Sequence, residues 1–302
     1  MTPHEFLKYI PATNCGECGY AACLAFAVAV TKGGVSPACC PYVKKESLPA
    51  AFSKDEQVGL EGVEQGQDER DMALVAHLKS KLQQLDFSQL SQVVGAAWSA
   101  DSPEQLAFHY LGRSVLLGRD EVVMDGEQLV DPRDQILLYN YVAFGDTDAS
   151  SGRSDNLGGL DRSRKEKRLP GGTWVGMESL PNSIAKIRTL ATYCEARLAE
   201  RFAGRLDDLA PLCQQIRGEQ PHDEQAQSAD FAAILPVLPH VPLYLLFWDQ
   251  DVEDGFEARV KILFDQHVMD FLDLESLVFA AERMADRLLA LHQETGRQVI
   301  NE

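Results

Sequence analysis

The spacing of the cysteines constrains this chain more than any other feature. Five of its seven cysteines lie within residues 11–42 of the 302-residue sequence. Cys15, Cys18 and Cys23 are spaced C-x2-C-x4-C, and Cys40 follows after sixteen intervening residues, directly before a proline. Three close thiolates with a remote fourth before proline are the ligand pattern of an iron–sulfur cube. The sequence therefore predicts that these four cysteines hold one 4Fe–4S cluster.

Zinc is the alternative metal for this ligand set. Structural zinc sites usually take their ligands as two separated pairs, whereas here three ligands fall within nine residues. Pro41 favours Cys40 over its neighbour Cys39 as the fourth ligand. We interpret Cys39 as a spare thiol, with an alternative ligand or an oxidation sensor as the other hypotheses. Cys194 and Cys213 lie in apolar helical surroundings and are predicted to be buried packing residues.

Two short helices are predicted around the cysteines. Thr2 and Glu5 form a capping-box pattern that starts a helix ending before Pro11. Residues 21–32 read as a second helix with Cys23 in its first turn. The N-terminus of that helix carries partial positive charge, which would face a net-negative thiolate cluster.

Bulk composition excludes several classes of partner. The formal net charge is −18 and the isoelectric point is near 4.8, which argues against binding to nucleic acid or to an anionic membrane surface. The N-terminus lacks the basic and apolar regions of a secretory signal, and the most apolar run, residues 21–30, is too short to span a bilayer. Clustered cysteines without an export signal indicate reduced thiolates. We therefore expect a cytoplasmic protein without membrane insertion.

The hydrophobic pattern predicts an α+β fold in three parts. Residues 1–50 form a small helical cluster domain, residues 51–71 a polar connector that is partly helical at best, and residues 72–296 a larger domain of antiparallel strands and helices. Strands are predicted at Ser114–Leu117, Glu121–Met124, Gln128–Val130, Val241–Trp248 and Ala258–Asp265. Helices are predicted at Met72–Leu85, Asp131–Val142, Ile184–Phe202, Leu206–Ile216 and Leu274–Leu291.

Two polar segments of the larger domain are candidate binding sites. Residues 249–255 resemble a calcium loop, but the sixth position is Asp254 instead of glycine and the twelfth is Val260 instead of glutamate. A solvated hairpin tip is the simpler interpretation, with a carboxylate site at Asp251 and Glu253 as the alternative. The basic run at residues 162–168 is predicted to be an exposed loop or a docking patch for an acidic partner. The sequence shows no catalytic triad, phosphate loop or dinucleotide fingerprint.

The cysteine region resembles a known family. The motifs that carry the resemblance are N-C-G-E-C-G at 14–19, C-L-A-F-A at 23–27, Gly33, and C-P-Y at 40–42. They are similar to the small 4Fe–4S domain at the N-terminus of the large subunit of the corrinoid iron–sulfur protein, which also occurs in Rnf-type electron-transport subunits. The resemblance implies the same four ligands, Cys15, Cys18, Cys23 and Cys40. It also implies anaerobic metabolism and a protein redox partner, for which a corrinoid protein is the candidate.

The larger domain resembles domain of unknown function 3786. The matching segments are L-P-x-L-P at 235–239, L-F-W-x-x-D at 246–251, I-L-F-D at 262–265, and L-P-G-G at 169–172. The likeness extends from Leu74 to Leu289 and implies an architecture without an activity.

Electron transfer is the function that these features favour. The protein would deliver or accept single electrons for a redox partner. A reductase-type enzyme with its substrate pocket in the C-terminal domain is one alternative. A non-catalytic protein, in which the cluster staples the N-terminus or senses oxygen, is the other.

Overall fold

The chain divides into two units, Met1–Ala73 and Leu74–Glu302. The computed structural model describes residues 2–15, 17–18, 20, 22–31, 35–44, 60–146 and 167–301, and for residues 60–69 and 296–301 it describes the backbone alone. The predicted connector therefore lies partly outside the described residues, as does most of the basic run at residues 162–168. Within the described parts, every helix is too short or too polar to cross a lipid bilayer.

The N-terminal unit is built from short helical segments around two phenylalanines. Its elements are α1 (Pro3–Phe6), η1 (Leu7–Tyr9), α2 (Cys23–Thr31) and η2 (Pro37–Cys39). The predicted capping box is confirmed, because the Glu5 N–H donates to Thr2 Oγ1 at 3.3 Å and the Thr2 N–H donates to Glu5 Oε2 at 2.7 Å. Phe6 and Phe26 are fully buried and meet edge to face at 6.1 Å. This contact joins α1 to α2.

A 23-residue helix, α4 (Leu60–Leu82), leads into the larger unit, and α5 (Phe87–Val93) follows it. A five-stranded antiparallel sheet comes next, with its strands in sequence order. The strands are β1 (Ala97–Ser99), β2 (Ser102–Tyr110), β3 (Arg113–Gly118), β4 (Val122–Met124) and β5 (Glu127–Gln128). Helix α6 (Pro132–Phe144) completes this half, starting where the Asp131-Pro132 pair predicted.

The second half of the larger unit is a four-stranded antiparallel sheet in the order β6-β9-β8-β7. Its strands are β6 (Trp174–Gly176), β7 (Phe231–Leu238), β8 (Val241–Trp248) and β9 (Arg259–Asp265). Its remaining helical elements are η5 (Met177–Ser179), α7 (Ile184–Leu190), the π-helical segment η6 (Ala191–Glu195), α8 (Ala196–Phe202), α9 (Leu206–Gln215), α10 (Glu224–Gln227), η7 (Val268–Asp270) and α11 (Leu274–Asn301). The architecture is α+β, as predicted, with a small helical unit and a larger unit of helices and antiparallel strands.

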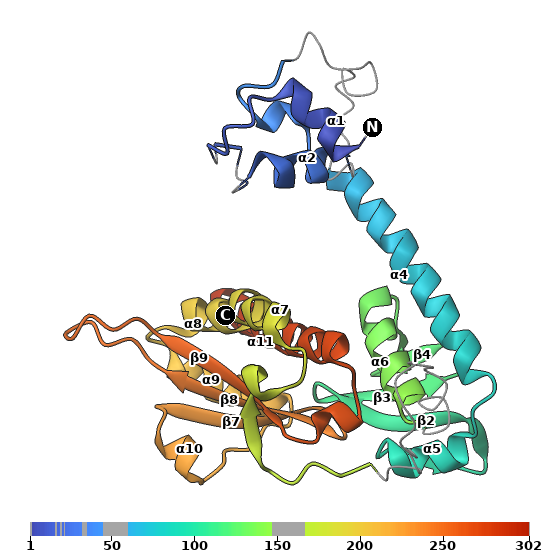
Figure 1. Ribbon diagram of the computed structural model, residues 1–302. Helices are drawn as coiled ribbons and strands as arrows, with labels where there is room; N and C mark the ends of the chain where they lie inside the picture. Colours follow the sequence, from blue (N-terminus) through green and yellow to red (C-terminus); the bar gives the residue numbers. More distant parts are fainter. Residues whose placement is uncertain are drawn as a thin grey trace, which may run out of the picture. The chain divides into compact units, whose positions relative to one another are not determined.

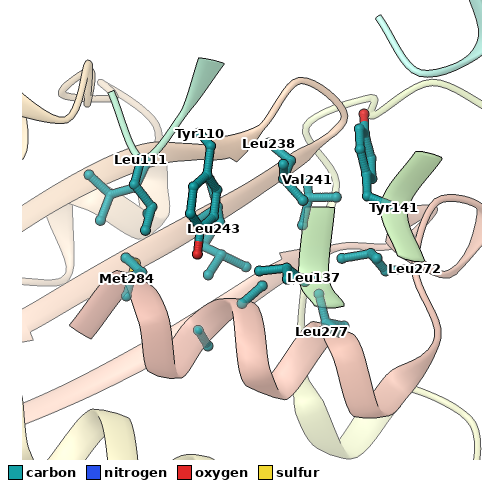
Figure 2. Packing of buried hydrophobic residues seen from close by; sticks show 14 of the residues in the cluster. Tyr110, Leu111, Leu137, Tyr141, Leu238, Val241, Leu243, Leu272, Leu277 and Met284 are labelled. Atoms are coloured by element: carbon teal, nitrogen blue, oxygen red, sulfur yellow. The ribbon is translucent and has the colours of Figure 1, made fainter. Parts of the chain in front are cut away.

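Helices α7, α8 and α11 lie together on one face of the four-stranded sheet (Figure 1). Residues of β2, β8, α6 and α11 interlock in the main core, where Tyr110 extends past Leu243 toward α11 (Figure 2). A smaller core on the opposite face holds Tyr244, whose ring meets Trp174 at 5.0 Å. Because both faces are covered, β7 and β8 are almost continuously buried.

A partly buried ionic network joins β2 to α6 and α11. Asp134 is 5% exposed and accepts a hydrogen bond from Tyr110 Oη at 2.7 Å. Arg283 of α11 binds the same carboxylate with Nε at 2.7 Å and Nη2 at 2.8 Å. The Arg283 Nη2 also donates to Asp131 Oδ2 at 2.8 Å. Every charge in this network therefore has a partner of opposite sign, as burial requires.

Candidate metal centre

The four predicted ligands differ in exposure but three of them share one core. Cys23 and Cys40 are buried, at 8% and 5% exposed, and Cys18 is half-buried, whereas Cys15 is exposed. Cys18, Cys23 and Cys40 pack in the same small apolar cluster as Phe6. The structure thus brings Cys18 and Cys23, close in sequence, together with the remote Cys40.

Asn14 holds Cys23 through two hydrogen bonds. The Asn14 side-chain Oδ1 accepts from the Cys23 backbone N–H at 2.8 Å, at the first residue of α2. The Asn14 backbone N–H points at the Cys23 Sγ, 3.3 Å away. Asn14 has a φ of 53°, in the left-handed region that asparagine tolerates better than most residues. The thiol of Cys23 therefore receives a backbone donor, and such donors stabilise negative charge on ligating sulfur.

Tyr42, two residues after Cys40, is hydrogen-bonded to Glu17, which lies between Cys15 and Cys18 in the sequence. The Tyr42 hydroxyl donates to Glu17 Oε1 at 3.0 Å. The pKa of Tyr42 is raised above its ordinary value, first by this hydrogen bond and by the Glu17 charge, with smaller contributions from Cys15 and Cys40. The hydrogen bond thus ties the loop at Glu17 to the segment that follows Cys40.

The adjacent residues Cys39 and Cys40 lie at the end of η2, where Cys39 is the last helical residue and Cys40 is the C-cap. Ser36 caps η2 by accepting from the Ala38 N–H at 3.2 Å, and η2 ends at Cys39. Cys39 is exposed, whereas Cys40 lies in the apolar cluster with Cys23. The two neighbouring thiols therefore occupy different environments, and Cys40 is the one inside.

Thiols are the donors that iron–sulfur clusters use. Among the described residues, no three His, Cys, Asp or Glu side chains converge where a single metal ion would sit. Four thiols, one of them accepting an N–H donor, fit the chemistry of such a cluster.

Comparison with known families agrees with this chemistry. Residues 10–42 match the family described as "Putative Fe-S cluster". This segment is similar to an iron–sulfur cluster domain. Residues 163–287 match a second family, the domain of unknown function DUF3786. The resemblance expected from the sequence is thereby confirmed for both regions, although the DUF3786 match begins at residue 163 instead of Leu74. No solved structure matches the chain.

The N-terminal region also resembles curated proteins. It is 46% identical over 54 residues to the corrinoid/iron-sulfur protein large subunit of Moorella thermoacetica, covering 17% of this chain and 12% of that protein. It is 49% identical over 45 residues to the acetyl-CoA decarbonylase/synthase complex subunit gamma 2 of Methanosarcina thermophila, covering 15% of this chain and 10% of that subunit. The chain thus spans only about a tenth of the length of these relatives.

The larger unit contains a cavity of about 580 Å³. It is lined by residues of β1, β2 and β3, by the β7–β8 turn, and by the segment after α9. Its walls are mainly apolar, and its ionisable side chains are those of His109, Arg217 and Glu219. The volume is in the range of small-molecule sites.

Other predicted candidates have structural roles. Cys194 and Cys213 are buried, at 0% and 2% exposed, as predicted, and burial raises the pKa of each thiol. Residues 249–255 form the tip of the β8–β9 connection, where Asp251 Oδ1 accepts from the backbone N–H groups of Glu253 and Asp254 at 2.9 and 3.1 Å.

Sequence reasoning missed the role of Asn14. The residue belongs to the motif that carries the resemblance, yet nothing in the spacing shows that its backbone would donate to Cys23. An asparagine placed before a tight cysteine loop is the signal that could have suggested a helix cap.

Proposed function

We propose that this chain is an electron carrier with one 4Fe–4S cluster held by Cys15, Cys18, Cys23 and Cys40. The observation that carries the proposal is the Asn14 N–H donating to the Sγ of Cys23, inside a segment that matches an iron–sulfur family. The burial of Cys40 supports it as the fourth ligand over exposed Cys39. In this proposal residues 1–50 are the cluster domain, 51–71 the connector and 72–296 the body.

A bound cube supplies reversible uptake and release of one electron. The chain's own residues hold it and set its electrostatic surroundings. Cys18, Cys23 and Cys40 would bind it from the apolar side, which limits the access of water. Asn14 would stabilise charge on the Cys23 sulfur, whereas the Glu17 carboxylate would oppose the added electron.

The partner that we propose is a corrinoid protein, in the cytoplasm of an anaerobic organism. Support comes from the name of one relative, a corrinoid/iron-sulfur protein large subunit. The experiment mixes the reduced, reconstituted chain anaerobically with a purified protein that carries oxidised corrinoid. Oxidation of the cluster coupled to reduction of cobalt is the expected result. A cluster that stays reduced in the presence of the corrinoid protein would remove this partner but leave the carrier proposal intact.

The cavity of about 580 Å³ favours one second candidate, an enzyme whose substrate binds in the body. In this alternative the cluster would feed electrons to a small molecule held near His109, Arg217 and Glu219. Glu219→Gln and Arg217→Gln would then abolish oxidation of the reduced cluster by that molecule, while cluster content and transfer to a protein partner stayed unchanged.

A further inference from the structure

A second cavity in the larger unit collects arginines. It measures about 400 Å³ and lies where α8 turns into α9, against α11. Its lining residues are Arg197, Glu200, Arg201, Ala203, Arg205 and Leu289. We call it the arginine cavity. Three arginines at one cavity are unexpected in a chain with a net charge of −18, because the field of such a chain does not concentrate anions.

A hydrogen bond to His292 fixes the orientation of the Arg201 guanidinium. Its Nε donates to Nδ1 of His292 at 2.8 Å. Since Nδ1 accepts this bond, the imidazole carries its proton on Nε2, which lies 3.3 Å from Oδ2 of Asp208. These two contacts, from Asp208 to His292 and from His292 to Arg201, therefore hold the guanidinium at its Nε. Both Nη groups of Arg201 remain without a partner among the described residues.

The other two arginines differ in whether their guanidinium groups already donate hydrogen bonds. Arg197 is engaged, because its Nη1 donates to Asp286 Oδ1 at 2.8 Å and to the Tyr193 carbonyl at 3.1 Å. Arg205 is exposed, and its guanidinium makes no hydrogen bond or ion pair with the part of the chain that the structure describes. Glu200 is the acidic side chain in the lining. The unused donors are thus the Nη groups of Arg201 and the whole guanidinium of Arg205.

We propose that the arginine cavity binds a small multiply charged oxyanion through Arg201 and Arg205. Planar guanidinium groups match the oxygens of phosphate and carboxylate with paired hydrogen bonds. A preorganised guanidinium loses less conformational entropy on binding, and here the contact with His292 supplies that order. The cavity volume is large enough for a phosphorylated metabolite or a small dicarboxylate. This inference does not depend on the cluster, because all of its residues belong to the larger unit.

The test measures anion binding by the full purified chain with isothermal titration calorimetry. Inorganic phosphate and succinate are titrated separately, each at fixed ionic strength with chloride as the reference anion. Tighter binding of phosphate assigns the site to phosphoryl groups, and tighter binding of succinate assigns it to carboxylates. Failure of both to bind more tightly than chloride overturns the proposal.

Substitutions test whether the anion binds at the arginine cavity. Arg205→Gln removes an exposed side chain that the fold does not use, and it should weaken binding of the preferred anion about tenfold or more. Arg201→Lys keeps the charge but loses the planar fork, so it should weaken binding similarly. Arg188→Gln, a change of equal charge at an exposed residue of α7, is the matched control and should leave affinity within about twofold. Equal affinities for Arg205→Gln and Arg188→Gln would contradict the site.

Discussion

Asn14 and Cys23 bind each other twice: Cys23 N–H donates to Asn14 Oδ1 at 2.8 Å, and Asn14 N–H donates to Cys23 Sγ at 3.3 Å. One residue thus caps helix α2 and places a donor on a proposed ligand. The side chain and the backbone of Asn14 have separable effects, which substitution can test.

Asn14→Asp should lower the reduction potential of the cluster. Aspartate keeps an acceptor for the Cys23 N–H but adds negative charge beside the Cys23 sulfur, and negative charge disfavours an added electron. We expect a shift on the order of tens of millivolts. Glu17→Gln removes a charge from the same neighbourhood and should shift the potential upward. Potentials of the two variants that move in the same direction would contradict this account.

Substitution of Cys39 and of Cys40 should show which of the two is the cluster ligand and which is the spare thiol. Cys40→Ser removes the buried sulfur and should lose most of the iron and acid-labile sulfide after anaerobic reconstitution. Cys39→Ser removes the exposed one and should retain the wild-type content. The reverse result, with Cys39 essential and Cys40 dispensable, would reassign the fourth ligand.

The carboxylate of Asp134 should contribute more to the stability of the larger unit than an exposed ion pair does. Asp134→Asn leaves Arg283 and Tyr110 without their charged acceptor in a buried position, so we expect a loss of about 3 kcal/mol in the free energy of unfolding. Asp125→Asn is the control, because its pair with Arg113 is 35–50% exposed and should be worth less than about 1 kcal/mol. Urea unfolding followed by circular dichroism measures both, and equal losses would refute the ranking.

Lys167 gives the larger unit a predicted pH dependence. Burial against Phe144 and Phe271 lowers the pKa of Lys167 to about 8, although Asp270 and Asp146 act in the opposite direction. Between pH 8 and the ordinary lysine pKa of 10.5, the unfolded chain holds a proton that the folded chain has released. The free energy of unfolding therefore increases with pH across that window.

Lys167→Met removes this contribution. The wild type should gain stability relative to Lys167→Met as the pH rises through the window, as measured by urea unfolding at several pH values. Lys81→Met, at an exposed lysine of α4, controls for the loss of a positive charge. A difference between wild type and Lys167→Met that stays flat or falls with pH would contradict the predicted shift.

Elements with a strong apolar pattern could be predicted from the sequence. Strand β8 has the predicted bounds, Val241–Trp248, because an unbroken apolar run of that length fits a strand buried on both faces. Strand β7 was not predicted, since Pro236 reads as a strand breaker. It is tolerated because β7 is at the edge of its sheet. Helix α4 begins at Leu60 instead of Met72, because its first turns have helix-forming but polar residues without an apolar period.

Of the candidate site, the sequence predicts the proposed ligands but not the residues around them. The C-x2-C-x4-C spacing predicts three of the proposed ligands, and the Cys40-Pro41 pair predicts the fourth. The pairing of Asp134 with Arg283, 149 positions apart, and the contact between Arg201 and His292, 91 positions apart, depend on tertiary packing. Local patterns in the sequence carry no information about such long-range partners.

The central claim is that Cys15, Cys18, Cys23 and Cys40 hold one cluster that exchanges single electrons. Anaerobic redox titration of the reconstituted full chain, followed by electron paramagnetic resonance, tests it most directly. The account predicts about four irons per chain and one reversible one-electron transition between about −700 and +450 mV, lost in Cys23→Ser. A chain that holds the irons but shows no reversible reduction in that range would contradict it.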